Sequence, residues 1–227
     1  MLKQENNAAF SKKRTRPQRG RWRFAAKRGF DIAVGSAMLF LFAPLMLLIS
    51  ALILFRDGWG VFYVHRRIGR HGRSFGCIKF RTMVKDADQR LEQILTADPA
   101  ACREWQTYQK LRNDPRIIPG IGHRLRQTSL DELPQIWNVI RGDMSIVGSR
   151  PVTREELVRY GPAGQLYMEM RPGLTGPWQI GSRSEISYEA RIRMDVEYFR
   201  SWSLVEDIRI TAKTALMVLK GRSPGAY

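Results

Sequence analysis

The chain has 227 residues and a formal net charge of +17. The length suits one domain with appendages, and the charge favours an anionic partner: nucleic acid, anionic lipid or phosphorylated metabolites. Two cysteines, Cys77 and Cys102, cannot form a disulfide framework, and with only three histidines beside them a structural zinc site is not expected. Nothing in this composition requires an oxidising compartment, so we expect the folded part to face the cytoplasm.

Residues 1–26 are predicted to form a basic, disordered tail. Up to Gly20 this segment is polar and poor in large apolar residues, and Lys12 to Arg14, Arg16 and Arg19 surround Pro17. A basic residue near an anionic membrane contributes about 1 kcal/mol of attraction. We therefore expect the tail to contact anionic lipid headgroups. The segment does not fit a signal peptide, because the apolar run starts late and no small-residue cleavage signature follows it.

Residues 27–56 contain an apolar segment, Ile32 to Phe55, without a charged side chain. Its length would allow a transmembrane helix of about 20 residues. However, Pro44 removes a backbone donor near the middle, and both flanks are basic, which places both on the cytoplasmic side. The pattern predicts a helix-break-helix that enters the membrane and returns, with a single kinked crossing helix as the alternative.

Residues 57–227 are predicted to form a small, helix-rich, irregular α/β catalytic domain. Two β-branched and aromatic runs around a Gly69–Gly72 turn predict a hairpin. Apolar periodicity predicts helices, and scattered Pro and Gly predict loops around short strands. The expected strands are Val61–Val64 and Phe75–Phe80, and the expected helices are Asp86–Asn113 with an interruption near Asp98-Pro99, Leu133–Arg141, Ser187–Phe199 and Leu204–Lys220.

The last of these helices has the pattern of an interfacial helix. Arg209, Lys213 and Lys220 share one face, and the rest of its surface is mostly apolar. Such a helix lies in the plane of the membrane surface.

An acidic pair, Asp131 and Glu132, stands within the segment Ser129 to Gln135. In the structural interpretation, Ser129 and Glu132 form a capping box and Asp131 interacts favourably with the helix dipole. Pro134 does not fit this fully, because it would lie one position too far into the helix for its missing N–H to cost nothing. In the functional interpretation, a carboxylate at a helix N-terminus near Arg126 has a lowered pKa and stays ionised, as a nucleophile or a magnesium ligand requires. Two carboxylates alone identify no reaction.

Several longer motifs, in one order, carry a resemblance from Lys27 onward. The chain resembles the monotopic phosphoglycosyl transferases, bacterial sugar transferases that start glycan assembly on polyprenyl phosphate. The matching motifs are Lys27-Arg28, Lys79 to Met83, Leu125-Arg126, Ser129 to Gln135, Arg141 to Ser145, Arg150-Pro151, Arg171 to Gly176 and Trp202-Ser203. Within the family, the chain is most similar to short enzymes that start exopolysaccharide synthesis with a hexose phosphate. Two motifs depart from the family pattern: Gly148-Ser149-Arg150-Pro151 has Ser where Pro is usual, and Gly181 to Ser184 replaces the usual Gly-Arg-Asn.

The resemblance implies roles for particular residues. Asp131 is implied as the nucleophile that takes a sugar phosphate from a UDP-sugar. Glu132 is implied to bind the metal or to position Asp131, and both carboxylates are candidate ligands of Mg²⁺. Cations implied to bind the substrate phosphates or the nucleotide are Lys79, Arg81, Arg126, Arg150 and Arg183. From the residues alone, an ordinary structural or solvated charge is the preferred explanation for Lys79, Arg81 and Arg171.

The implied function is transfer of hexose 1-phosphate, from glucose or galactose, to undecaprenyl phosphate on the cytoplasmic face of the bacterial inner membrane. One alternative is the same reaction with a UDP-N-acetylhexosamine. Another is a basic membrane-associated nucleic-acid binder or scaffold, which we disfavour because the charge is divided among discrete motifs and no nucleic-acid module is recognisable. The sequence does not distinguish the epimeric sugars, and it does not indicate an oligomeric state.

Overall fold

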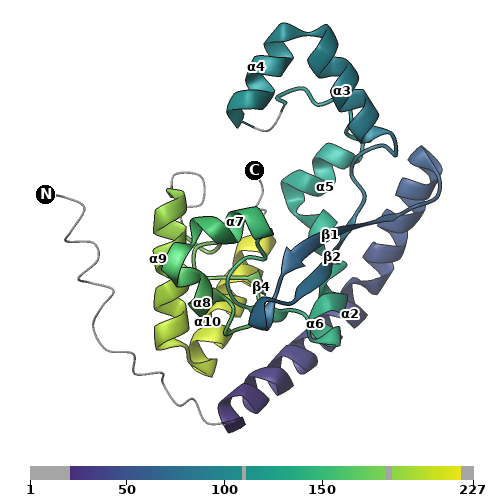
Figure 1. Ribbon diagram of the computed structural model, residues 1–227. Coiled ribbons are helices and arrows are strands. Elements are labelled where there is room, and N and C mark those ends of the chain that lie inside the picture. Colours follow the sequence, from purple (N-terminus) through teal and green to yellow (C-terminus); the bar gives the residue numbers. More distant parts are fainter. Residues whose placement is uncertain (1–20, 109–110, 182–185, 221–227) are drawn as a thin grey trace, which may run out of the picture.

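The computed structural model describes residues 21–108, 111–181 and 186–220 (Figure 1). A long helix, α2 (Arg21–Asp57), runs along one edge of the molecule, and the hairpin of β1 (Phe62–Ile68) and β2 (Ser74–Phe80) lies beside it. Helices α3 (Ala87–Ala97) and α4 (Pro99–Tyr108) project from the body, and α9 (Tyr188–Ser201) and α10 (Leu204–Leu219) form its other side. The remaining elements are η1 (Arg70–Gly72), α5 (Gly122–Thr128), η2 (Leu130–Glu132), α6 (Gln135–Arg141), β3 (Ser145–Val147), α7 (Arg154–Arg159), η3 (Gly161–Ala163), α8 (Gly164–Tyr167) and β4 (Gly173–Thr175). The expected helix-rich α/β character is confirmed.

The predicted break in the N-terminal helix is absent, because α2 continues through Pro44. A proline inside a helix removes one backbone hydrogen bond, but it does not end a helix that is held on both sides. Both halves of α2 are held here, by side chains described below. The helix also begins before the predicted segment, so residues 21–26, assigned to the tail, form its first turns.

One face of α2 packs against the rest of the molecule. Its buried residues recur at helical spacing: Lys27, Asp31 and Gly35 in the first half, and Ile49 and Ile53 in the second. Gly35 allows a close approach to α6, because a Cβ there would lie 3.4 Å from Ile140 Cγ1. Ile49 and Ile53 belong to a core cluster with Phe80, Val84, Ile118 and Leu125. The two ends of α2 therefore pack against the same folded body.

Charged groups at the start of α2 are buried and paired. Lys27 Nζ lies 2.7 Å from Asp207 Oδ2 of α10, and Asp207 also accepts hydrogen bonds from Tyr198 and Trp202. One helical turn on, Asp31 Oδ1 accepts from Ser145 Oγ at 2.8 Å and from the backbone N–H of Ile146 at 2.9 Å. These bonds fix the start of α2 to β3 and α10.

The other face of α2 is apolar and exposed. Phe40 and Phe55 are each 87% exposed, and the same surface carries Ile32, Leu41, Leu47, Leu48 and Leu52. By length and composition, this is the one helix among the described residues that is long and apolar enough to cross a membrane. Large contiguous apolar surfaces of this kind mark interaction sites.

The predicted hairpin is confirmed, with longer strands than expected. β1 and β2 pair antiparallel, with Tyr63 opposite Lys79 and His65 opposite Cys77. β3 and β4, the short strands expected in the loop-rich region, pair parallel. Asn138 joins α6 to the hairpin, since its side chain accepts a hydrogen bond from Ile78 N at 3.0 Å and donates one to Gly76 O at 2.7 Å.

The other predicted helices are present with small shifts in their ends. The interruption near Asp98-Pro99 separates α3 from α4, and α6 ends at Arg141, followed by the capping residue Gly142, whose φ of 95° is readily adopted by glycine. In α10, Asp207 and Ile210 face the core, whereas Arg209 and Lys213 are exposed together with the apolar Val205, Ile208, Leu216 and Leu219. α5, α7 and α8 are short helices for which the sequence pattern gave no prediction.

Candidate active site

The acidic pair lies in a 3₁₀ turn and not at the start of an α-helix. α5 ends at Thr128, Ser129 takes a left-handed conformation with φ 56°, and Asp131 and Glu132 follow in η2. The predicted capping box is wrong, because the Ser129 side chain makes no capping hydrogen bond. The helix begins only at Gln135, immediately after Pro134, where a missing N–H costs nothing. The conformation of Ser129 costs roughly 1 kcal/mol or more, and such strain is often found at functional sites.

Glu132 is held by two cations from different parts of the chain. Its Oε1 lies 2.7 Å from Lys79 Nζ of β2 and 3.4 Å from Arg150 Nη2 of the loop after β3. Burial raises the pKa of Glu132, but Arg150 and Lys79 outweigh burial, so the pKa is lowered overall. Glu132 is therefore ionised at neutral pH.

Asp131 has the opposite shift. Burial raises its pKa to about 6, the charge of Glu132 contributes in the same direction, and Lys79 and Arg126 oppose it. The expected lowered pKa is therefore found in Glu132 and is wrong for Asp131. At neutral pH Asp131 is still mostly ionised, but it is more basic than an ordinary aspartate, which suits a nucleophile. Adjacent carboxylates with divergent pKa values indicate different roles.

The predicted arginines have different surroundings. Arg126 Nε donates to Thr82 Oγ1 at 2.8 Å, and Arg126 lies close enough to Asp131 to affect its pKa. Arg81 binds Asp57 and the backbone carbonyls of residues 57–60, so it joins the end of α2 to β2. These contacts support a structural role for Arg81 and not the predicted role in binding substrate. Arg171, which donates to the carbonyl of Gly142, is a second structural arginine. Arg183 lies outside the described residues.

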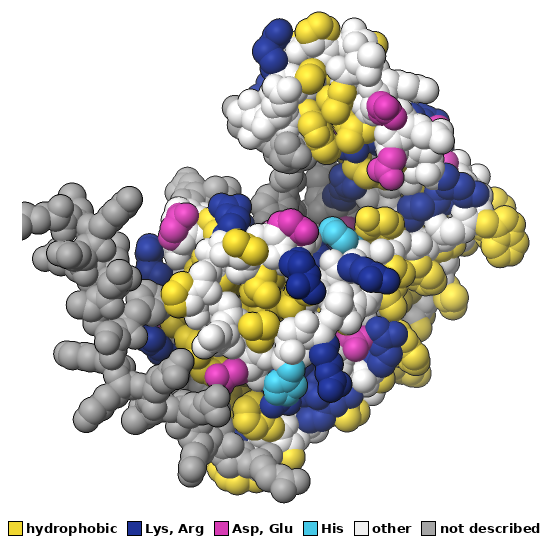
Figure 2. All heavy atoms as spheres, in the orientation of Figure 1, with side chains coloured by type: hydrophobic (Ala, Val, Ile, Leu, Met, Phe, Trp, Pro, Cys, Tyr) yellow, Lys and Arg dark blue, Asp and Glu magenta, His cyan; other side chains and the backbone are white. Residues whose placement is uncertain are grey.

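A cleft of about 730 Å³ opens between the hairpin, η2 and the projecting α3–α4 pair. Figure 2 shows this hollow, with several Lys and Arg side chains around it. The volume is that of a small-molecule site. Predicted site residues that line it are Lys79, Arg81, Arg126, Asp131, Glu132 and Arg150. The structure thus brings together six of the seven predicted residues.

The cleft also contains polar residues that the sequence analysis did not select. Tyr63 and His65 of β1 line it, as does Thr82, the partner of Arg126. The only sequence signal for Tyr63 is the period-2 alternation of the predicted strand, and His65 lies one residue beyond the predicted end of that strand. The observed register places both on the same face as Lys79.

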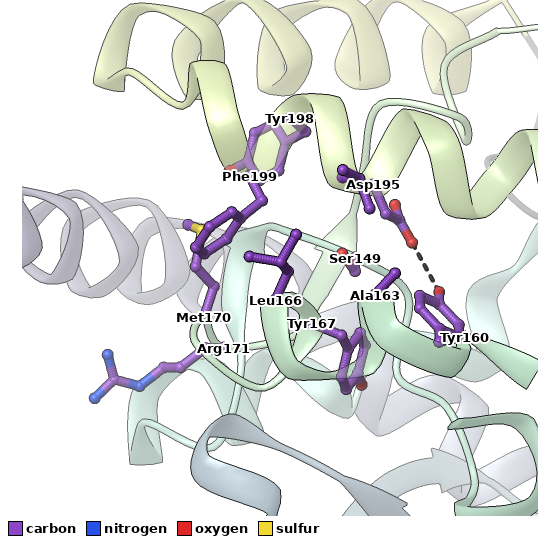
Figure 3. Close-up of a pocket in the computed structure, with 11 residues that line it drawn as sticks. Ser149, Tyr160, Ala163, Leu166, Tyr167, Met170, Arg171, Asp195, Tyr198 and Phe199 are labelled. Carbon is purple, nitrogen blue, oxygen red and sulfur yellow. Dashed lines mark hydrogen bonds between the residues drawn. The ribbon is translucent and has the colours of Figure 1, made fainter. Parts of the chain in front are cut away.

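A second, much smaller cavity is lined by Ser149, Tyr160 and Asp195 among others (Figure 3). Its volume of about 10 Å³ fits a water molecule but no substrate. Asp195 of α9 accepts a hydrogen bond of 2.8 Å from Tyr160, and Figure 3 shows Arg171 pointing away from both. Burial raises the pKa of Asp195 to about 7, against the opposing effect of Tyr160 and Ser149. Ser149, a departure from the family pattern, is therefore a polar neighbour of Asp195.

The residues of the cleft are compatible with a magnesium ion. The described residues contain no cluster of three or more His, Cys, Asp or Glu that could hold a metal by itself. Mg²⁺ is commonly bound by one or two carboxylates together with substrate phosphates. Asp131 and Glu132, adjacent in the chain and both at the cleft, provide such a partial set of ligands.

The chain is similar to known proteins along most of its length. A family model described as bacterial sugar transferase matches residues 22–221. The exopolysaccharide production protein ExoY of Rhizobium meliloti (strain 1021) is 50% identical over 202 residues, which cover 89% of this chain and 88% of that protein. The undecaprenyl-phosphate galactose phosphotransferase of Salmonella typhimurium is 45% identical, over 88% of this chain and 41% of that protein. The undecaprenyl-phosphate glucose phosphotransferase of Komagataeibacter xylinus is 36% identical, over 83% of this chain and 35% of that protein. The chain therefore belongs to the bacterial sugar transferase family and is a phosphoglycosyl transferase.

Proposed function

We propose that this enzyme transfers hexose 1-phosphate from a UDP-hexose to undecaprenyl phosphate through a covalent intermediate on Asp131, and so starts the assembly of an exopolysaccharide. The observation that carries the proposal is the unequal acidic pair in the cleft: Glu132 is neutralised by Lys79 and Arg150, whereas Asp131 is more basic than usual. The two phosphotransferases described above are named for galactose and for glucose, and this favours a hexose over an N-acetylhexosamine as the sugar transferred.

The reaction has two displacements at one phosphorus atom. A carboxylate oxygen of Asp131 attacks the β-phosphorus of the UDP-hexose, the bond from that phosphorus to the bridging oxygen breaks, and UMP leaves with the bridging oxygen. A phosphate oxygen of the lipid then attacks the same phosphorus, the bond to Asp131 breaks, and the carboxylate is regenerated. The products are UMP and a polyprenyl diphosphate sugar. The two substrates need not be bound together.

Charge is the main obstacle, because a carboxylate must approach an anionic diphosphate. Lys79, Arg126 and Arg150 line the cleft and offset this repulsion. Asp131 and Glu132 would hold Mg²⁺, which when bound neutralises charge on the phosphates. Glu132 also keeps Lys79 next to Asp131.

The first prediction concerns the order of events. Without any lipid acceptor, the enzyme should release about one equivalent of UMP from UDP-hexose, because the first displacement is complete before the second begins. Initial rates against the two substrates should give parallel double-reciprocal lines. Chelation of magnesium should suppress the UMP burst. Intersecting lines without acceptor-independent UMP would indicate direct attack by the lipid phosphate and would contradict the proposal.

We further propose that α2 lies at the cytoplasmic membrane surface with both ends on the same side. Two observations support this placement. The outer face of α2 is apolar and exposed, and both ends of its inner face pack against one folded body, through Lys27 at the start and Ile53 near the end. A helix that crossed the membrane would separate the two sets of contacts by the thickness of the bilayer, about 30 Å.

A second prediction tests this topology. In a Cys102→Ser background, where the remaining Cys77 is buried, single cysteines are introduced in place of Ala9 and of Gly221. An impermeant maleimide should label neither site in intact spheroplasts and both sites after permeabilisation. A periplasmic cysteine in another membrane protein serves as the positive control. Labelling of the Ala9 site in intact spheroplasts would mean that α2 crosses the membrane.

A further inference from the structure

A chain of hydrogen bonds joins α7 to the cleft side of β1. Arg67 Nη1 lies 2.7 Å from Glu156 Oε2, and Arg67 Nη2 lies 3.2 Å from Nδ1 of His65. Glu156 is fixed in turn, because its Oε2 also accepts from the backbone N–H of Thr153 at 2.7 Å in the capping box of α7. The orientation of the His65 ring is therefore set from a neighbouring element.

The partner of His65 also determines which ring nitrogen carries the proton. A guanidinium has only donors, so Nδ1 of His65 must accept, and the proton of the neutral ring is on Nε2. Burial lowers the pKa of His65, Arg67 and Lys79 lower it further, and Glu156 and Glu155 oppose them. Near neutral pH the ring is therefore uncharged and presents a single N–H donor, at Nε2.

This donor belongs to the wall of the cleft. Tyr63, His65 and Arg67 alternate along β1 and so share one face of the strand, and Tyr63 pairs with Lys79 across the hairpin. Lys79 in turn binds Glu132. Tyr63, His65 and Lys79 all line the cleft. His65 thus places a fixed, neutral donor in the cleft that also contains the acidic pair.

We propose that His65 donates a hydrogen bond from Nε2 to an oxygen atom of the bound UDP-sugar, and that Arg67 and Glu156 are positioning residues for this bond. The inference rests on the proposed function, since it takes a UDP-sugar as the occupant of the cleft. The acceptor is an oxygen of the sugar hydroxyls or of the diphosphate, which share the ability to accept from an N–H group. A neutral donor suits either, because it adds no positive charge that would hold the nucleotide after transfer.

The protonation state can be measured directly. The chain has three histidines, so the ¹⁵N ring signals of His65 can be assigned by comparing the wild-type protein with His65→Gln. Two-bond nitrogen–proton correlation should show His65 with its proton on Nε2. In Arg67→Met the donor to Nδ1 is lost, and the signals should move towards a mixture of the two tautomers. A proton on Nδ1 in the wild-type protein would overturn the proposal.

The contact with substrate is tested by kinetics. Loss of one neutral hydrogen bond in His65→Leu should raise KM for UDP-sugar about 10-fold, with little change in kcat. His65→Gln keeps an N–H near the position of Nε2 and should retain most of the affinity, and Arg67→Met should be intermediate. Arg66→Met is the matched control, since Arg66 is an exposed arginine on the opposite face of the same strand. An unchanged KM in His65→Leu would overturn the proposal.

Two further comparisons make the outcome specific. If the accepting oxygen is the 4-hydroxyl, at which the two sugars differ, His65→Leu should change the ratio of activities with UDP-glucose and UDP-galactose, whereas a contact with the diphosphate or with another hydroxyl should weaken both equally. Either result supports the bond from His65. Failure of the proposed function is distinguishable, because the wild-type enzyme would then release no UMP without acceptor. A normal UMP burst together with an unchanged KM in His65→Leu would refute only the role of His65.

Discussion

Replacing Asp131 with Asn is expected to reduce turnover by about 10³-fold or more, because an amide is not a nucleophile for phosphorus. The side chain keeps its size. η2 is held by backbone hydrogen bonds from the N–H groups of residues 132 and 133 to the carbonyls of Ser129 and Leu130, which do not involve this side chain. The fold should therefore survive. Exposure of the purified variant to UDP-sugar labelled in the sugar should give no protein-bound label and no UMP, whereas the wild-type enzyme should give both.

Two controls separate loss of the nucleophile from general damage. Asp86→Asn makes the same chemical change at an exposed aspartate that pairs with Arg90 in the next turn, and it should retain activity. Glu132→Gln should also be strongly impaired, but with an altered magnesium dependence if this residue is a metal ligand. Turnover of Asp131→Asn comparable with that of Asp86→Asn would remove Asp131 from the role of nucleophile.

Lys27→Met is expected to destabilise the folded protein by about 3–5 kcal/mol, although Lys27 lies outside the cleft. The substitution leaves Asp207 buried at 0% exposure without its cation. Thermal unfolding in detergent or nanodiscs should show a large fall in the midpoint. Lys213→Met, which removes an exposed lysine from α10, should have little effect.

A second variant keeps this prediction decisive if Lys27→Met fails to fold. Lys27→Met combined with Asp207→Asn removes both charges and leaves an amide to interact with Tyr198 and Trp202. The double variant should therefore be more stable than Lys27→Met alone. If the double variant were the less stable of the two, the uncompensated charge would not be the cause of the instability.

Local patterns were sufficient to predict most elements outside the membrane segment. The hairpin followed from β-branched and aromatic runs around a glycine turn, and α9 and α10 from apolar periodicity. The acidic pair and its cations were predicted from the motifs that carry the family resemblance, and six of the seven predicted site residues meet at one cleft.

The errors arose where distant contacts decide the outcome. The continuity of α2 through Pro44 depends on partners such as Asp207 and Phe80, which the local sequence does not reveal. The same holds for the two pKa shifts, since Lys79 and Arg150 reach Glu132 from separate elements. The capping box failed because Ser129 takes a left-handed conformation, which local preference disfavours for serine. The role of His65 could not be seen without the register of the hairpin and the position of α7.

The buried pair of α2 and α10 also has a consequence for how the protein is made. Lys27 and Asp207 are 180 residues apart in the chain, and at about 5–20 residues per second the ribosome needs roughly 10–40 seconds to synthesise the intervening segment. The β3 partners are made 114–120 residues after Lys27 and Asp31, and Asp207 of α10 only 180 residues after Lys27, so these two side chains at first lack their partners. Their charges must remain hydrated or among lipid headgroups, since burial without a partner is costly. We therefore expect the start of α2 to stay at the water interface during synthesis until α10 brings the carboxylate of Asp207 to Lys27.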